Sequence, residues 1–132
     1  MTDFFKLFRE DEWLARVNGD PEFKQTSRWT DVTFVIAADD VKKAFKVQSA
    51  NLARVDVAPG ETVIELNGSN RVWSEFMQPM PLPHHHHVLA MDRRCDDFSI
   101  ASGRHELIQN LRVLSIVLDL LRACAAPSEA AK

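Results

Sequence analysis

Residues 105–124 read HELIQNLRVLSIVLDLLRAC, the most informative stretch of the chain. With a helical period, its polar residues fall in one narrow stripe: Gln109, Arg112, Ser115, Asp119 and Arg122. An ordinary surface helix has an apolar stripe a little over about 100° wide, and the apolar arc here is wider. The extra apolar flank must be covered by a second layer of the same chain, by a partner chain, or by a bound apolar ligand.

The composition is that of one ordinary globular domain. The chain has 132 residues, 45% of them hydrophobic and 27% charged, with a formal net charge of -3. We expect a single domain over residues 1–126 and a frayed tail over 127–132. The basic residues are scattered rather than gathered on one face, so no nucleic-acid partner is expected.

No uncharged apolar run approaches the roughly 20 residues that span a bilayer, so no membrane span is expected. Charges interrupt the apolar residues of the N-terminus, which does not read as a secretory signal. Cys95 and Cys124 lack the spacing of a redox or metal motif and indicate reduced thiols. The sequence therefore predicts a cytoplasmic protein.

Between Asp31 and Asn67 the hydrophobic period changes to two, as in β-strands. Four short runs alternate apolar and polar residues, over 32–37, 45–48, 53–57 and 62–66. Short connections and polar alternation predict an antiparallel meander with one buried face. Residues 97–101 predict a fifth strand, which precedes the terminal helix.

Helices are predicted before and after the four strands. A first amphipathic helix starts near Phe4 and ends near Asn18-Gly19, and Asp20 caps a second that runs to about Arg28-Trp29. Asn70 caps a third, and a proline-rich segment with four histidines follows it. The predicted fold class is α+β, a mainly antiparallel five-stranded sheet covered on one face by helices, with an apolar cleft between the layers.

Three local phrases resemble the sterol carrier protein 2-like domain family. They are residues 14–23 (LARVNGDPEF), residues 63–68 (VIELNG) followed by the Trp73 helix, and residues 98–103 (FSIASG) before the last helix. The order of elements is similar too, from Leu14 to Cys124. The resemblance implies helices on one face of a five-stranded sheet and an apolar tunnel that takes sterols, fatty acyl chains or acyl-CoA. It also implies use as an accessory module beside enzymes, and no cofactor.

The histidine run His84-His85-His86-His87 is the first candidate for chemistry. Consecutive residues of an extended loop point alternately to opposite sides, so at most two can face one metal ion. No motif spacing supplies the remaining ligands, and no metal is predicted. A histidine paired with Asp92, Asp96 or Asp97, or His105 in such a pair, could act in acid–base catalysis. Nothing in the spacing fixes a pair, so no catalytic residue is assigned.

The predicted function is non-catalytic binding of an apolar small molecule in the cleft between sheet and helices. The predicted ligand contacts are Trp73, Phe76, Met77, Met80, Leu82, His84, His85, His86, His87, Met91, Leu107, Leu111, Leu114 and Leu118. One alternative is a small cup-shaped hydratase, isomerase or hydrolase with the histidines in its pocket. Another is an accessory subunit that contacts a partner enzyme subunit, and a homodimer through the 106–124 helix is a further expectation.

Overall fold

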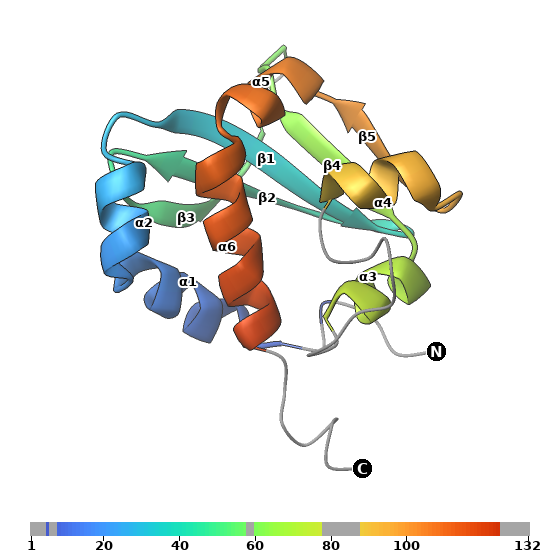
Figure 1. Ribbon diagram of the computed structural model, residues 1–132, viewed down its shortest axis with the longest axis horizontal. Helices are drawn as coiled ribbons and strands as arrows, with labels where there is room; N and C mark the ends of the chain where they lie inside the picture. Colours follow the sequence, from blue (N-terminus) through green and yellow to red (C-terminus); the bar gives the residue numbers. More distant parts are fainter. Residues whose placement is uncertain (1–4, 6–7, 58–59, 78–87, 125–132) are drawn as a thin grey trace.

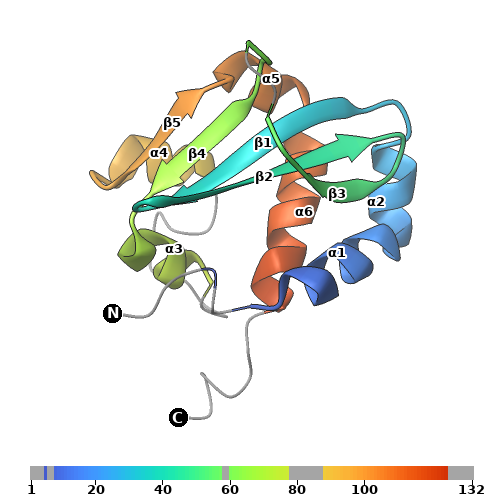
Figure 2. The same cartoon turned by 180° about the vertical axis from the view of Figure 1, so that it is seen from behind.

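The structure is a computed structural model that describes residues 5, 8–57, 60–77 and 88–124 (Figure 1). The predicted α+β class is confirmed: one five-stranded sheet carries helices against one of its faces (Figures 1 and 2). The strands are β1 (Asp31–Ala38), β2 (Val41–Gln48), β3 (Leu52–Val55), β4 (Ile64–Gly68) and β5 (Phe98–Ser102). The helices are α1 (Glu10–Asn18), α2 (Pro21–Thr26), α3 (Asn70–Phe76), α4 (Val88–Arg94), α5 (Arg104–Gln109) and α6 (Leu111–Ala123). Within the described ranges, no helix has the length and apolar character needed to cross a bilayer.

The sheet order is β3-β2-β1-β4-β5, and this corrects the predicted meander. Strand β4 does not pair with β3; it lies parallel to β1, with Phe34 opposite Ile64, while the other three pairs are antiparallel. The connection from β3 therefore returns across the sheet (Figure 2). In this position Ile64 and Leu66 are both 0% exposed.

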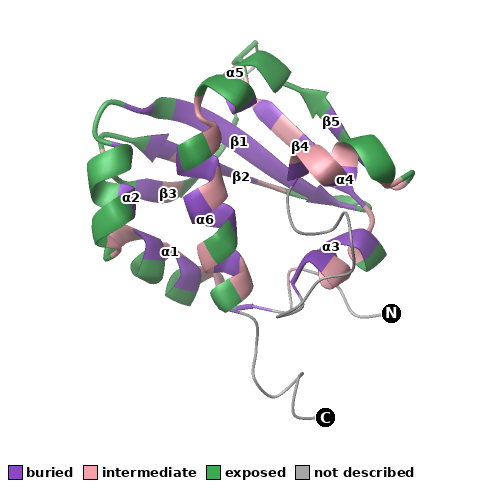
Figure 3. Cartoon of the chain, in the orientation of Figure 1, coloured by how far each residue is buried: buried purple, intermediate pink, exposed green. Residues whose placement is uncertain are grey.

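Strand β1 is buried on both faces, where the sequence predicted one. Phe34 and Ile36 face the helices, but Thr33, Val35 and Ala37 on the other face are also buried (Figure 3). The hydroxyl of Thr33 donates to Glu61 Oε2 at 2.8 Å. The connection between β3 and β4 thus supplies cover for the face that the helices leave open.

Two of the predicted helix starts differ from the structure. The Asp20 cap is confirmed, since its carboxylate accepts from the Phe23 amide at 2.8 Å. Helix α1 begins only at Glu10, and α3 is capped by Ser69, whose hydroxyl accepts from the Val72 amide at 3.1 Å. Asn70, the predicted cap, instead donates to Asp39 at 2.8 Å through its side chain.

The terminal segment forms two helices rather than one, with the break at Asn110. The Asn110 side chain donates to the Glu106 carbonyl at 2.9 Å, and its own carbonyl accepts from the Leu114 amide at 3.0 Å. Asn110 thereby completes the end of α5 and the start of α6, at a backbone φ of -116° and ψ of 25°. Such local side-chain bonds compete with a continuous helix.

The wide apolar arc of α6 is covered by the same chain. Its buried side chains are Val113, Leu114, Ile116, Val117, Leu118 and Leu121. Helix α1 packs against it, with Trp13 Nε1 donating to the Val117 carbonyl at 3.0 Å. The premise for a dimer through this helix, an uncovered apolar flank, does not hold. A charge at Leu121, which is 0% exposed, would test folding rather than association.

Gly103→Ala should destabilise the fold more than Gly60→Ala. Both glycines have a left-handed backbone, with φ of 75° and 80°, where a Cβ costs about 1–2 kcal/mol. At Gly103 a Cβ would also lie 2.5 Å from the Val63 carbonyl oxygen and 2.6 Å from Ile64 Cα, while no described atom lies within 4 Å of the one at Gly60. We expect losses of about 3 kcal/mol and about 1 kcal/mol, respectively. Urea denaturation measures both, and equal losses would contradict this account of the turn into α5.

Candidate functional site

Helices α3, α4, α5 and α6 enclose a small cleft, which we call the apolar cleft. It is lined by Phe76, Val88, Leu107, Leu111, Leu114, Ser115, Leu118 and Asp119. Its volume of about 10 Å³ is at the limit for a single water molecule. Its walls come from separate helices: Phe76 and Val88 on one side, and the residues of α5 and α6 on the other.

The structure brings together five of the predicted ligand contacts in this cleft: Phe76, Leu107, Leu111, Leu114 and Leu118. Trp73, Met77 and Met91 belong instead to the buried core. The Trp73 indole donates to the Ala37 carbonyl at 3.0 Å and packs edge-on against Phe98 at 5.5 Å between ring centroids. Met80, Leu82 and the histidines His84, His85, His86 and His87 lie outside the described residues.

Three lining residues were not predicted: Val88, Ser115 and Asp119. Ser115 and Asp119 were assigned to the polar stripe of the last helix, and they lie where that stripe meets the cleft. Helical spacing could have identified Ser115 as a lining residue, because Leu111, Ser115 and Leu118 follow one another at intervals of four and three and so share a face. Val88 carried no such signal, since a four-residue apolar patch does not show its period.

Arg122 lies beside the apolar cleft and contacts two of its lining residues. Its Nε donates to the Phe76 carbonyl at 2.7 Å, and its guanidinium lies 4.3 Å from the centroid of the Phe76 ring. Asp119 is 3.5 Å away. Burial lowers the pKa of Arg122 and Asp119 partly offsets this, but a guanidinium stays charged at neutral pH. The cleft therefore has a fixed cation at one side.

The carboxylates considered for acid–base catalysis are held in ion pairs. Asp92 accepts from Arg104 at 2.7 Å and from the Ile100 amide at 3.1 Å. Asp97 accepts from the Ser69 hydroxyl at 2.5 Å and from Arg71 at 2.8 Å. Burial raises the pKa of each carboxyl, but these hydrogen bonds and arginines outweigh it, and both pKa values lie below the ordinary one. A carboxylate with a lowered pKa is a weak base and is not protonated at neutral pH.

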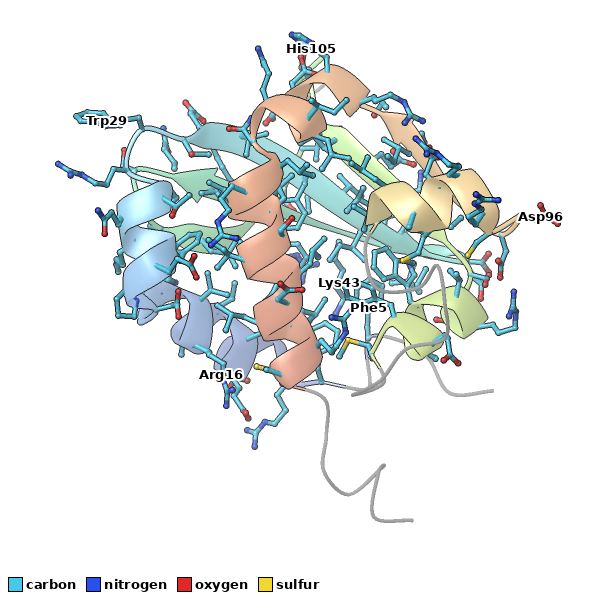
Figure 4. All side chains as sticks on the ribbon, viewed as in Figure 1. Phe5, Arg16, Trp29, Lys43, Asp96 and His105 are labelled. Carbon is cyan, nitrogen blue, oxygen red and sulfur yellow. The ribbon has the colours of Figure 1, made fainter. Side chains whose placement is uncertain are left out.

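Among the described residues, the remaining candidates for a histidine–aspartate pair, His105 and Asp96, do not meet. His105 and Asp96 project from different parts of the surface (Figure 4). Over the described ranges, no three histidine, cysteine, aspartate or glutamate side chains gather closely enough to hold a metal ion.

A second hollow lies on the face of the sheet opposite the helices. It is an open groove of about 330 Å³ lined by Val35, Lys42, Ala44, Arg54, Val55, Asp56, Val57, Val63 and Glu65. Two of its lining residues form an ion pair, with Lys42 3.2 Å from Glu65. The apolar cleft is the more enclosed of the two and is lined mainly by apolar side chains.

The free energy of unfolding should fall in acid, partly through Asp92 and Asp97. Their folded pKa values are lowered, so the stability they contribute is present above the unfolded pKa of about 3.9 and is lost as the pH falls through the folded pKa. Asp97→Asn should remove about 1–2 kcal/mol near neutral pH and make the decline in acid shallower. Urea denaturation from neutral pH into acid measures both the loss near neutral pH and the acid slope. Asp40→Asn, on the exposed β1–β2 turn, is the control. An acid slope identical to that of the unsubstituted chain would contradict the role given to Asp97.

Comparisons with models of protein families, with curated proteins and with solved structures found no match for this chain. The resemblance to the sterol carrier protein 2-like family therefore stays a prediction from local sequence.

Proposed function

We propose that this chain binds an apolar, lipid-like small molecule in the apolar cleft without converting it chemically. The cleft carries this proposal: six apolar side chains line it, and Ser115 and Asp119 are its polar residues. Small-molecule sites are typically apolar concavities with a few placed polar groups. A sterol or a fatty acyl chain has the matching chemistry, an extended apolar body with one polar end.

The cleft must widen to admit such a ligand, because about 10 Å³ holds no more than a water molecule. Phe76 and Val88 lie on α3 and α4, whereas the opposite wall belongs to α5 and α6. Separating these walls breaks no hydrogen bond of the sheet, but it breaks the one from Arg122 on α6 to the Phe76 carbonyl on α3. The apolar area that the ligand covers offsets the cost of opening, at about 25 cal/mol per Å².

Binding is favoured over catalysis by the state of the carboxylates. Asp92 and Asp97 each accept from an arginine, and both have lowered pKa values. General acids and bases are instead tuned toward the working pH. The sequence resemblance to the sterol carrier protein 2-like family supports the same ligand class. The free thiols of Cys95 and Cys124 fit a reducing compartment, and we propose the cytoplasm.

A fluorescent polyene fatty acid, cis-parinaric acid, tests the proposal by direct titration. We expect micromolar affinity, about -8 kcal/mol. Leu111→Gln should weaken binding at least about tenfold, because it replaces apolar contact worth about 1.5–3 kcal/mol with an amide. Leu120→Gln is the matched control: it is also partly buried against the core on α6, but it does not line the cleft.

Thermal melting of both variants separates loss of the site from loss of the fold. The proposal fails if the unsubstituted chain takes up no probe. It also fails if Leu111→Gln and Leu120→Gln weaken binding equally while both remain folded.

A further inference from the structure

Trp29 stands out because it is the exposed one of the three tryptophans. Its side chain is 90% exposed, whereas Trp13 and Trp73 are 0% exposed. It projects from the turn between α2 and β1, away from the body of the molecule (Figure 4). A tryptophan can bury about 150–250 Å², so its exposure leaves a large favourable contribution unused.

The turn that carries Trp29 is held firmly. The Ser27 hydroxyl donates to the Phe23 carbonyl at 2.6 Å, and the Thr30 and Ala50 amides both donate to the Ser27 carbonyl at 3.1 Å. Ser27 itself is 0% exposed. Bonds to α2 and to the β2–β3 turn therefore fix the backbone on each side of the indole, which is presented to solvent on a rigid support.

One cation lies beside this indole, and a second contacts the β2–β3 turn that supports it. The Arg28 guanidinium is 5.7 Å from the Trp29 ring centroid, and Lys24 Nζ donates to the Ala50 carbonyl at 3.3 Å. Among the described residues, no carboxylate lies within salt-bridge distance of either cation, while nearby Asp31 is paired with Lys46 at 3.7 Å. On a chain of net charge -3, this corner therefore presents two cations that no described carboxylate neutralises at close range.

We propose that Trp29, Lys24 and Arg28 form a docking site for an anionic lipid bilayer. Tryptophan partitions to the headgroup level of membranes, with its ring in the apolar boundary. Lysine and arginine are attracted to anionic headgroups. This function is separate from ligand binding in the apolar cleft.

The geometry favours a bilayer over a protein partner. A stable protein interface buries about 800 Å² on each partner around an apolar core. Here one aromatic side chain projects from a convex corner. Of the other exposed large apolar residues, Val41 starts β2 at the opposite end of β1, Val57 follows β3, and Ile108 lies on a separate helix, α5. A fluid bilayer accepts a single projecting indole without a complementary surface.

A change of intrinsic tryptophan fluorescence on adding vesicles reports on Trp29, because the other two tryptophans are buried. We expect vesicles of phosphatidylcholine with phosphatidylserine to shift the emission of Trp29 to the blue, and brominated lipids to quench it. The effect should weaken as salt is raised, since salt screens exposed charges. Vesicles of phosphatidylcholine alone should give a much smaller shift.

Variants assign the binding to this corner. Lys24→Gln with Arg28→Gln should lower vesicle partitioning about 30-fold, from two cations at about 1 kcal/mol each. Arg93→Gln with Arg94→Gln removes the same charge from exposed positions on α4 and should have little effect. Trp29→Ala, followed by co-sedimentation, should reduce binding at least tenfold, and its melting curve reports whether the fold is kept.

Three results would overturn the proposal. The first is no spectral shift and no co-sedimentation with anionic vesicles. The second is vesicle binding that the Lys24 and Arg28 variants and the Arg93 and Arg94 variants weaken equally. The third is a blue shift with polyglutamate but none with vesicles, which would identify an acidic protein as the partner.

Discussion

The packing of α6 against the helix-covered face of the sheet is the constraint on which the rest of the structure depends. Its six buried side chains each contribute about 1.5–3 kcal/mol, and the Trp13–Val117 hydrogen bond joins α1 to the same helix. On its other flank, α6 meets Phe76 of α3 and Val88 of α4 across the apolar cleft. One helix thereby links the two halves of the core, so a charge introduced on its buried arc would disturb both.

Packing explains the positions of two of the three tryptophans, but not that of the third. The indole nitrogens of Trp13 and Trp73 donate to the Val117 and Ala37 carbonyls, each at 3.0 Å. An unpaired donor at such a buried position would cost about 1–3 kcal/mol. Over the described ranges, no buried side-chain nitrogen or oxygen lacks a partner. Trp29 serves no such purpose: its turn is held by Ser27, and packing gives no reason for an indole there.

The local sequence predicted the individual helices and strands better than it predicted which strands pair. The Asp20 cap and the wide apolar arc of the last helix follow from spacing alone, and both are present. The parallel pairing of β4 with β1 does not follow, because it depends on residues thirty positions apart, and the described residues between β3 and β4 form no crossover helix to signal it. The break at Asn110 depends on one side-chain bond to Glu106, which competes closely with a continuous helix. In the apolar cleft, the helical period predicted the lining residues of α5 and α6. The residues next to Trp29 in the sequence, in contrast, do not indicate that its side chain is exposed.

The α5 wall of the apolar cleft and the Trp29 corner lie toward the same end of the sheet. Strand β4 runs parallel to β1, and β5 returns antiparallel to β4, so α5 emerges at the end where β1 begins (Figure 1). Helix α5 turns Leu107 into the cleft and leaves Ile108 55% exposed. A bilayer that meets this end would therefore lie close to one wall of the cleft. An apolar ligand passing between the two would then cross less water, and exposure of its apolar area to water is the main barrier to such transfer.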